Sequence, residues 1–112
     1  MLAEQNPQSN IIFKMFIKIH HSYRNVVALA DADLIGKKFE EGKLQLDVRE
    51  SFYKGKKVSK EQAIELLKKQ KLEDVTFNIV GPKSIKAAIE AEIIKKENMG
   101  KIQNIEFALT LL

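Results

Sequence analysis

The segment VVALAD, residues 26–31, constrains the fold most, because it is apolar without alternation. A strand with one solvated face alternates apolar and polar residues, whereas a strand covered on both faces reads as a continuous apolar run. We therefore expect a central strand with a layer of structure on each side. The preceding IIFKMFIKI, 11–19, is typical of a strand, and HSYRN between the two supplies turn residues, which predicts an antiparallel hairpin.

The next segment, DADLIGKKF, predicts a compact corner. Asp31 or Asp33 can cap one short helical turn, and Gly36 can end it in the left-handed conformation. EEGKLQLDV, 40–48, then alternates cleanly, with Leu44, Leu46 and Val48 on one face. This alternation predicts one strand with a solvated face.

Two helices are expected in the second half of the chain. Ser59 and Gln62 have the spacing of a capping box ahead of an apolar stripe, which predicts a helix over 60–70. VTFNIVG reads as a strand ending at Gly81, and Pro82 opens a second helix that we expect to span 82–96.

The fold class follows from the order of these elements. After a break at 98–100, IQNIEFALTLL closes the chain as a strand, placed at the sheet edge. Strands followed by interleaved helices predict an α+β fold: a single small two-layer domain with a mixed, mostly antiparallel sheet and two helices on one face. Residues 1–11 are polar and aperiodic, which predicts a flexible N-terminal tail before a domain at 12–112, and Met15 is an alternative start.

Composition and missing motifs exclude several classes of function. The chain has no cysteine, which excludes disulfides, thiolate nucleophiles and Cys-rich zinc sites. Its apolar stretches fall far below the ~20 residues of a membrane span, and no leader pattern opens it, so we expect a cytoplasmic protein without membrane contact. No Ser-His-Asp order, HExxH or GxSxG occurs, and neighbouring His20 and His21 diverge on a strand. We expect no catalysis, cofactor or metal.

Charge points to an anionic partner. Nineteen Lys and Arg against fifteen Asp and Glu give a net charge of +4, and the only arginines are Arg24 and Arg49. Lysine acts as a point charge and lacks the bidentate geometry that reads guanine edges. Nucleic-acid binding would therefore depend on backbone phosphates more than on base reading.

The first candidate site is SFYKGKK, residues 51–57. An aromatic ring can stack on an unpaired base while lysines meet phosphates, which predicts an RNA-binding surface. The site residues are Tyr53, Lys54, Lys56 and Lys57. Alternatively the segment is a structural turn in which Phe52 packs in the core and the lysines are solvated. Strand geometry would place at most one of the two aromatics in the core.

The second candidate is the strand-to-helix junction NIVGPKS. Free backbone N–H groups at a helix N-terminus suit an anion, so Gly81, Lys83 and Ser84 form a candidate anion-binding site. The segment lacks the glycine spacing of a P-loop, and Pro82 removes one donor. Ordinary helix capping is the alternative.

Three segments, ALADADLIGKKFEEGKLQLDV, SFYKGKKVS and NIVGPKSI, resemble in this order the archaeal family called domain of unknown function 424. The resemblance covers about Met15 to the end. It implies a small α+β domain of the archaeal cytoplasm, without established activity, in the company of translation genes. Family members usually carry a cysteine at the position of Ala30 and a Pro-His pair at Glu106 and Phe107. Either this chain lacks a functional thiol and imidazole, or both positions are structural.

These observations favour a binding module for RNA or a ribonucleoprotein in translation or ribosome assembly. One alternative is a protein-interaction subunit or homo-oligomer that uses an exposed sheet face or the C-terminal strand Ile105–Leu111. The other is a small anionic-ligand protein or enzyme at the junction of Gly81 with Ser84.

Overall fold

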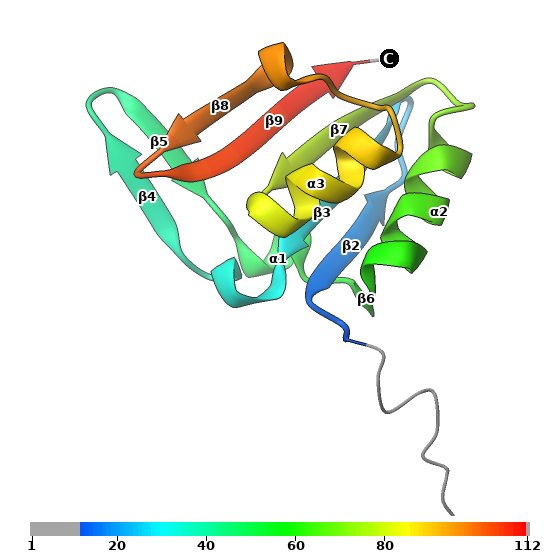
Figure 1. The fold of residues 1–112 in the computed structure, drawn as a ribbon, viewed down its shortest axis with the longest axis horizontal. Coiled ribbons are helices and arrows are strands. Elements are labelled where there is room, and N and C mark those ends of the chain that lie inside the picture. The colour runs from blue at the N-terminus through cyan, green and yellow to red at the C-terminus, as the bar shows by residue number, and fades with distance from the viewer. Residues whose placement is uncertain (1–11, 112) are drawn as a thin grey trace, which may run out of the picture.

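A mixed six-stranded sheet organises residues 12–111, the part of the chain that this computed structural model describes (Figure 1). Its strand order is β6-β2-β3-β7-β9-β8. The strands are β2 (Met15–His20), β3 (Asn25–Asp31), β6 (Lys56–Val58), β7 (Val75–Val80), β8 (Met99–Ile102) and β9 (Ile105–Leu111). Every neighbouring pair is antiparallel except β3 and β7, which are parallel. The predicted mixed, mostly antiparallel sheet is confirmed, and the predicted tail lies outside the described residues.

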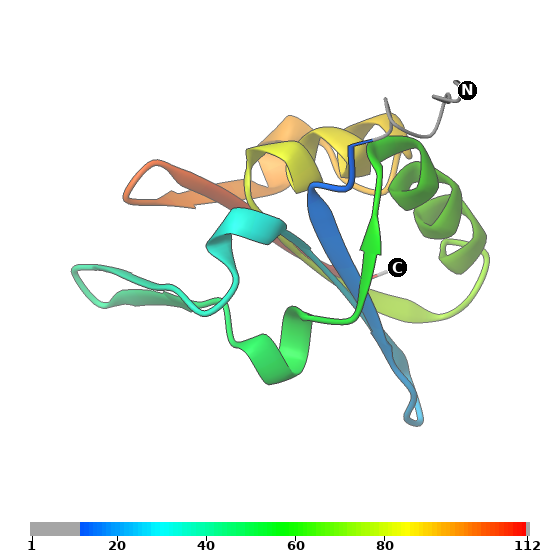
Figure 2. The ribbon, with the colours of Figure 1, turned by 90° about the horizontal axis from the view of Figure 1, so that it is seen from below.

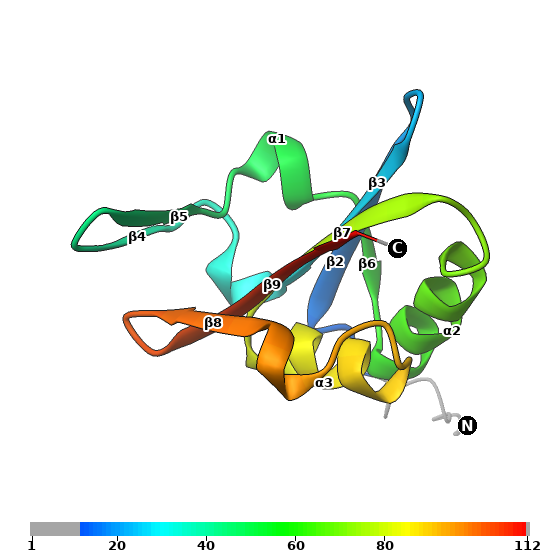
Figure 3. The same ribbon diagram turned by 90° about the horizontal axis from the view of Figure 1, so that it is seen from above.

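Helices cover one face of the sheet and smaller elements cover part of the other (Figures 2 and 3). The two longer helices, α2 (Lys60–Gln70) and α3 (Pro82–Glu90), pack on the first face. The second face carries a short helix, α1 (Glu50–Tyr53), and a separate hairpin of β4 (Lys38–Glu41) and β5 (Leu44–Asp47). Two 3-10 turns, η2 (Ala32–Leu34) and η3 (Lys96–Asn98), complete the fold. The predicted α+β class with two helices on one face is confirmed.

Two apolar cores result, and β3 belongs to both. Val27 and Leu29 point into the larger core beneath α2 and α3, whereas Ala28 and Ala30 point into the smaller core beneath α1 and the β4–β5 hairpin. All four side chains are completely buried. The unalternating run therefore marks the central strand, as its pattern predicts. No helix within residues 12–111 is long and apolar enough to cross a membrane.

The boundaries of α2 match those predicted, because its start is specified locally. The Ser59 hydroxyl accepts a hydrogen bond from the Gln62 backbone N–H at 3.2 Å, and the Gln62 side chain accepts one from the Ser59 N–H at 3.0 Å. This reciprocal capping box satisfies two of the donors that a helix N-terminus leaves free.

The single strand predicted over 40–48 is wrong, because the chain reverses within it. Gly42 has φ +62° and lies in the turn between β4 and β5. In the hairpin that these two strands form, Phe39 lies opposite Leu46. Leu44, next to this turn, is 54% exposed and belongs to neither core. Phe39 and Leu46 are the residues that pack against the smaller core.

The end of the second helix was also predicted too far along the chain. The helix ends at Glu90, and Glu92 has φ +62°, which takes the backbone out of the helical path. Ile93 and Ile94 after this turn are still buried. Because these two residues continue the apolar pattern of the helix, the prediction extended the helix through them. In the structure they are buried but lie outside the helix.

The predicted break at 98–100 contains the start of a strand. β8 begins at Met99 and pairs with β9 through a turn at Gln103 and Asn104, both of which have positive φ. The sheet edge on this side is therefore β8, whereas β9 lies between β7 and β8. Gly100 fits within the strand because the ring of Phe107 lies over it, with Phe107 Cζ 2.7 Å from the place of an added Cβ.

Candidate functional site

The lysine-rich segment 51–57 joins α1 to the edge strand β6. β6 pairs with β2 so that Lys56 lies opposite Ile17 and Lys57 opposite Phe16. Gly55 precedes it at a point of close contact, since a Cβ there would lie 2.3 Å from the carbonyl oxygen of Ile17. Glycine is thus required for α1 and β6 to approach β2.

The two aromatic residues of this segment have exchanged their expected places. Tyr53 is only 7% exposed and belongs to the smaller core, while Phe52 is half-buried and stacks on His20 with ring centroids 4.4 Å apart. Burial, with a smaller contribution from the charge of Asp47, raises the pKa of Tyr53 to about 12. Strand alternation did not apply, because both residues lie on the helix α1. The Tyr53 ring therefore offers no open face to a base in this structure.

The three lysines of the segment are exposed, as both interpretations expected. Lys54, which directly follows α1, has its Nζ 3.7 Å from the carboxylate of Glu50 at the start of that helix. Lys57 Nζ lies 5.7 Å from the centre of the Phe16 ring, within the range of a cation–π contact. We call Lys54, Lys56 and Lys57 the edge lysines.

The histidines contribute no metal site in the described part of the chain. His20 Nε2 lies 2.8 Å from the carbonyl oxygen of Phe52, while His21 is exposed. Among residues 12–111 no group of three or more His, Cys, Asp or Glu is arranged to hold a metal ion.

The junction predicted to bind an anion already holds a carboxylate of the protein itself. Asp31 accepts hydrogen bonds from the backbone N–H groups of Lys83 at 3.1 Å and Ser84 at 2.8 Å, and from the Ser84 hydroxyl at 2.7 Å. Asp31 is 1% exposed. Its expected role as cap of the nearby turn η2 is wrong, since no side-chain bond caps that turn. The same carboxylate caps α3, so the backbone donors of the junction are not open to an external anion.

Gly81 makes this arrangement possible. It adopts φ +104°, which favours glycine, and a Cβ at this position would lie 2.4 Å from the carboxylate carbon of Asp31. Lys83, the next residue of the predicted site, directs its Nζ to within 3.9 Å of Asp31 and remains partly exposed. Of the three predicted residues, Lys83 alone can reach an outside ligand.

Beside this junction lies a groove of about 770 Å³, bounded by the start of β2 and the first turns of α2 and α3. Lysines from three segments of the chain, the residue before β2 and the helices α2 and α3, line it: Lys14, Lys60, Lys83 and Lys86. Glu61 is the acidic side chain among its lining residues. We call it the lysine groove. Because Ser59 and Lys60 directly follow β6, the groove adjoins the strand that carries the edge lysines.

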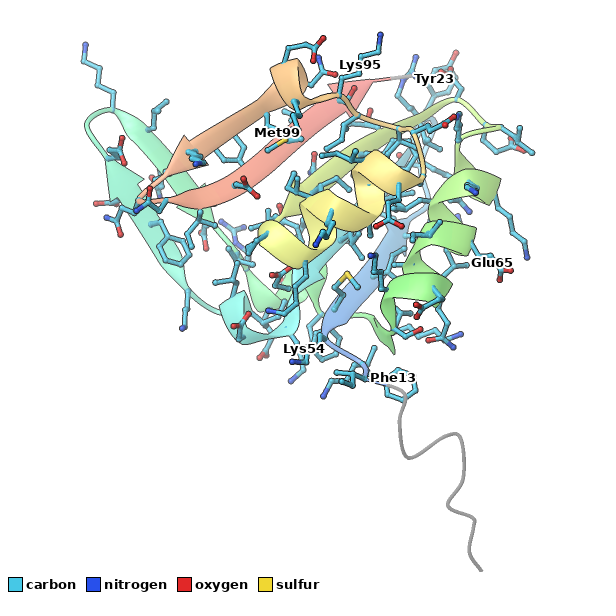
Figure 4. The ribbon with its side chains drawn as sticks, in the orientation of Figure 1. Phe13, Tyr23, Lys54, Glu65, Lys95 and Met99 are labelled. Carbon is cyan, nitrogen blue, oxygen red and sulfur yellow. The ribbon has the colours of Figure 1, made fainter. Side chains whose placement is uncertain are left out.

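Sequence reasoning missed Phe13 and most of the groove lysines. Phe13 is 42% exposed and lies in the chain between two groove residues, Ile12 and Lys14. The more exposed Tyr23 lies far from Lys54, as Figure 4 shows. An aromatic residue beside a lysine at the start of the domain was the available signal, but the lysines gather only in the folded chain.

Two of the positions at which this chain departs from the resembling family, Ala30 and Phe107, are occupied by packed side chains. Ala30 is completely buried in the smaller core, where a cysteine would behave as a small apolar residue. Phe107 packs against the same core and covers Gly100. In this chain both positions therefore contribute to packing.

Comparison with known proteins gives the fold and the family. No curated protein matches the chain. A crystal structure of an uncharacterized conserved protein from Methanopyrus kandleri is similar, with a TM-score of 0.77 and 23% sequence identity over 87% of this chain and 90% of that one. At this identity the similarity concerns the fold alone. A family model matches residues 19–111, which confirms the resemblance seen in the sequence, and the chain belongs to the family described as Protein of unknown function (DUF424).

Proposed function

We propose that this protein is a small RNA-binding module that holds the phosphate backbone with its edge lysines. The observation that carries this proposal is the exposure of Lys56 and Lys57 on the edge strand β6, and of Lys54 two residues before that strand. Their short strand is followed directly by the lysine groove, so positive charge extends along adjoining surfaces. The company of translation genes that the family resemblance implies makes translation or ribosome assembly the proposed setting.

Binding of this kind is electrostatic and tolerant of sequence. Each lysine that neutralises a phosphate releases a counterion, so affinity falls steeply as salt rises. Phe13, rather than the buried Tyr53, is proposed to stack on an unpaired base. It is 42% exposed, and Met15, two residues later, pairs with Val58 of the edge strand β6. Base identity is expected to contribute little, because segment 51–57 contains no arginine that could read a guanine edge.

The test measures binding of a labelled single-stranded RNA by fluorescence anisotropy over a series of salt concentrations. Replacing Lys54, Lys56 and Lys57 by alanine is expected to reduce the slope of log affinity against log salt by about 2, at roughly 0.7 per lost phosphate contact. The matched control replaces Lys68, Lys69 and Lys71, which are exposed at the far end of α2. An unchanged slope in the edge variant, or an equal loss in the control, would refute the proposal.

Leu109 supports a second candidate function, a protein-interaction subunit. This residue is 68% exposed on the second face of the sheet, beyond the cover of α1. β9 pairs with β7 over Phe107–Leu111 but with β8 only over Ile105–Ala108, so a partner at Leu109 would meet an exposed side chain and a strand edge that β8 does not cover. Purification from the native host with and without ribonuclease separates the two functions. RNA and companions lost together on treatment favour the first, and one protein that stays bound to wild type but not to Leu109→Lys favours the second.

A further inference from the structure

The lysine groove gathers positive charge that the described residues do not fully neutralise. Lys60 Nζ lies 2.6 Å from the Glu90 carboxylate, and Lys83 lies near Asp31. Lys14 and Lys86 form no ion pair within residues 12–111, although both line the groove. Like charges brought to one cavity repel each other, and an anion between them relieves that repulsion.

Several backbone donors at this place are already paired within the protein, so we expect a ligand to use mainly the side chains. Asp31 occupies the N-terminus of α3, and Ser59 accepts the Gln62 N–H at the start of α2. The charged donors that face the groove are its lysine ammonium groups. Ammonium groups bind phosphate as point charges on flexible stems and tolerate several phosphate geometries.

The groove is too large for an inorganic anion alone. Its volume of about 770 Å³ falls within the roughly 300–1,000 Å³ typical of small-molecule sites. Apolar side chains also line it: Met15, and Ile12, which is 59% exposed. An exposed isoleucine beside lysines suits a ligand that has an organic body as well as phosphate.

From the volume, the apolar lining and the lysines of three segments of the chain, we propose that the lysine groove binds a phosphorylated molecule of mononucleotide size. Its phosphates lie between Lys14 and Lys86, and its organic part rests against Ile12 and Met15. This site uses lysines other than the edge lysines and does not depend on the RNA-binding proposal. The phosphate chemistry has two sources, a free nucleotide or a nucleotide of an RNA strand, which the experiment separates.

The experiment titrates the full chain with adenosine diphosphate, pyrophosphate and adenosine in separate calorimetric runs. We expect adenosine diphosphate to bind, pyrophosphate to bind more weakly, and adenosine not to bind. The double variant Lys14→Ala/Lys86→Ala should weaken adenosine diphosphate binding about 100-fold, at roughly tenfold per lost charged contact. Lys68→Ala/Lys69→Ala is the matched control, and the edge variant should bind adenosine diphosphate like wild type.

Two results would overturn the inference. The first is no binding of adenosine diphosphate to the wild-type protein at millimolar concentration; if the groove variant also weakens RNA binding in that case, the groove belongs to the RNA path. The second is equal weakening of adenosine diphosphate binding by the Lys68→Ala/Lys69→Ala control. Because the edge variant tests RNA binding separately, failure of one proposal leaves the other measurable.

Discussion

Asp31 binds Ser84 through a single carboxylate oxygen that accepts both the backbone N–H, at 2.8 Å, and the hydroxyl, at 2.7 Å. The two residues are 53 positions apart, at the end of β3 and in the first turn of α3. Since β7 pairs with β3 and leads directly into α3, this contact fixes the helix over the parallel centre of the sheet.

Removing the Asp31 carboxylate is expected to destabilise the fold. Asp31→Ala leaves the donors of Lys83 and Ser84 unsatisfied in a buried place, with an expected loss of about 2–3 kcal/mol in the free energy of unfolding. Urea unfolding followed by circular dichroism measures the loss. The control is Asp33→Ala, on the exposed side of the same corner, which should change stability by less than about 0.5 kcal/mol. Equal effects of the two substitutions would contradict the capping role.

A methyl group at Gly81 should disturb the same cap from the other side. Gly81→Ala combines an unfavourable positive φ with a Cβ 2.4 Å from the Asp31 carboxylate carbon. We expect a loss of about 3 kcal/mol or more, from about 1–2 kcal/mol of backbone strain and a similar steric cost. Gly36→Ala has a positive φ but open space around its Cβ, so it isolates the strain alone. If both variants unfold at the same urea concentration, the steric part is absent.

The raised pKa of Tyr53 determines how the free energy of unfolding should change in alkaline solution. Its pKa in the folded protein is about 12, above the ordinary value of 10.0, because burial disfavours the phenolate. The folded state therefore holds the proton more tightly. The resulting stabilisation is complete below pH 10 and is lost as pH rises from about 10 to about 12, by about 2–3 kcal/mol in total.

Two variants test this expectation. Tyr53→Phe should show a shallower fall in the free energy of unfolding over that interval than wild type. Tyr23→Phe leaves Tyr53 as the sole tyrosine, so its tyrosinate absorbance should titrate with a midpoint near pH 12. A midpoint near 10 would show that Tyr53 is not buried in solution.

Asn78 offers a stabilising substitution. Its side-chain oxygen is shielded from solvent and has no hydrogen-bond partner among the described residues, on a strand position beside Ala28 and Leu109. Asn78→Val removes this unpaired acceptor and suits a strand, so we expect a gain of about 1 kcal/mol in unfolding free energy. Thr76→Val, on the same face of β7, is the control for strand propensity alone. A loss of stability in Asn78→Val would mean that the amide has an essential contact.

Sequence patterns predicted the elements whose signals are local. The capping box at Ser59 marked the start of α2, and the unalternating run of β3 marked the sheet centre. Patterns failed where two strands share one alternating segment, as at Gly42, or where a glycine enters a strand because an aromatic ring covers it, as at Gly100. Such features depend on contacts between residues that the sequence does not show to be neighbours.

The candidate sites were predictable in part. The edge lysines lie on the surface as expected, because burying several unpaired ammonium groups would be unfavourable. Tyr53 is buried because residues 50–53 form one helical turn, and a segment of four residues is too short to show a helical pattern in the sequence. The use of Asp31 by α3 and the gathering of four lysines at the groove both require the tertiary fold.

The parallel pairing of β3 with β7 has a consequence for how the chain folds. Asn25 lies opposite Val75, so about half of the chain must be looped out before the centre of the sheet can close. The entropy of closing such a loop slows folding, whereas the β2–β3 hairpin needs only a local turn. We expect the β2–β3 hairpin to form early as the chain leaves the ribosome. The pairing of β3 with β7 is expected to form only after α3 has been synthesised.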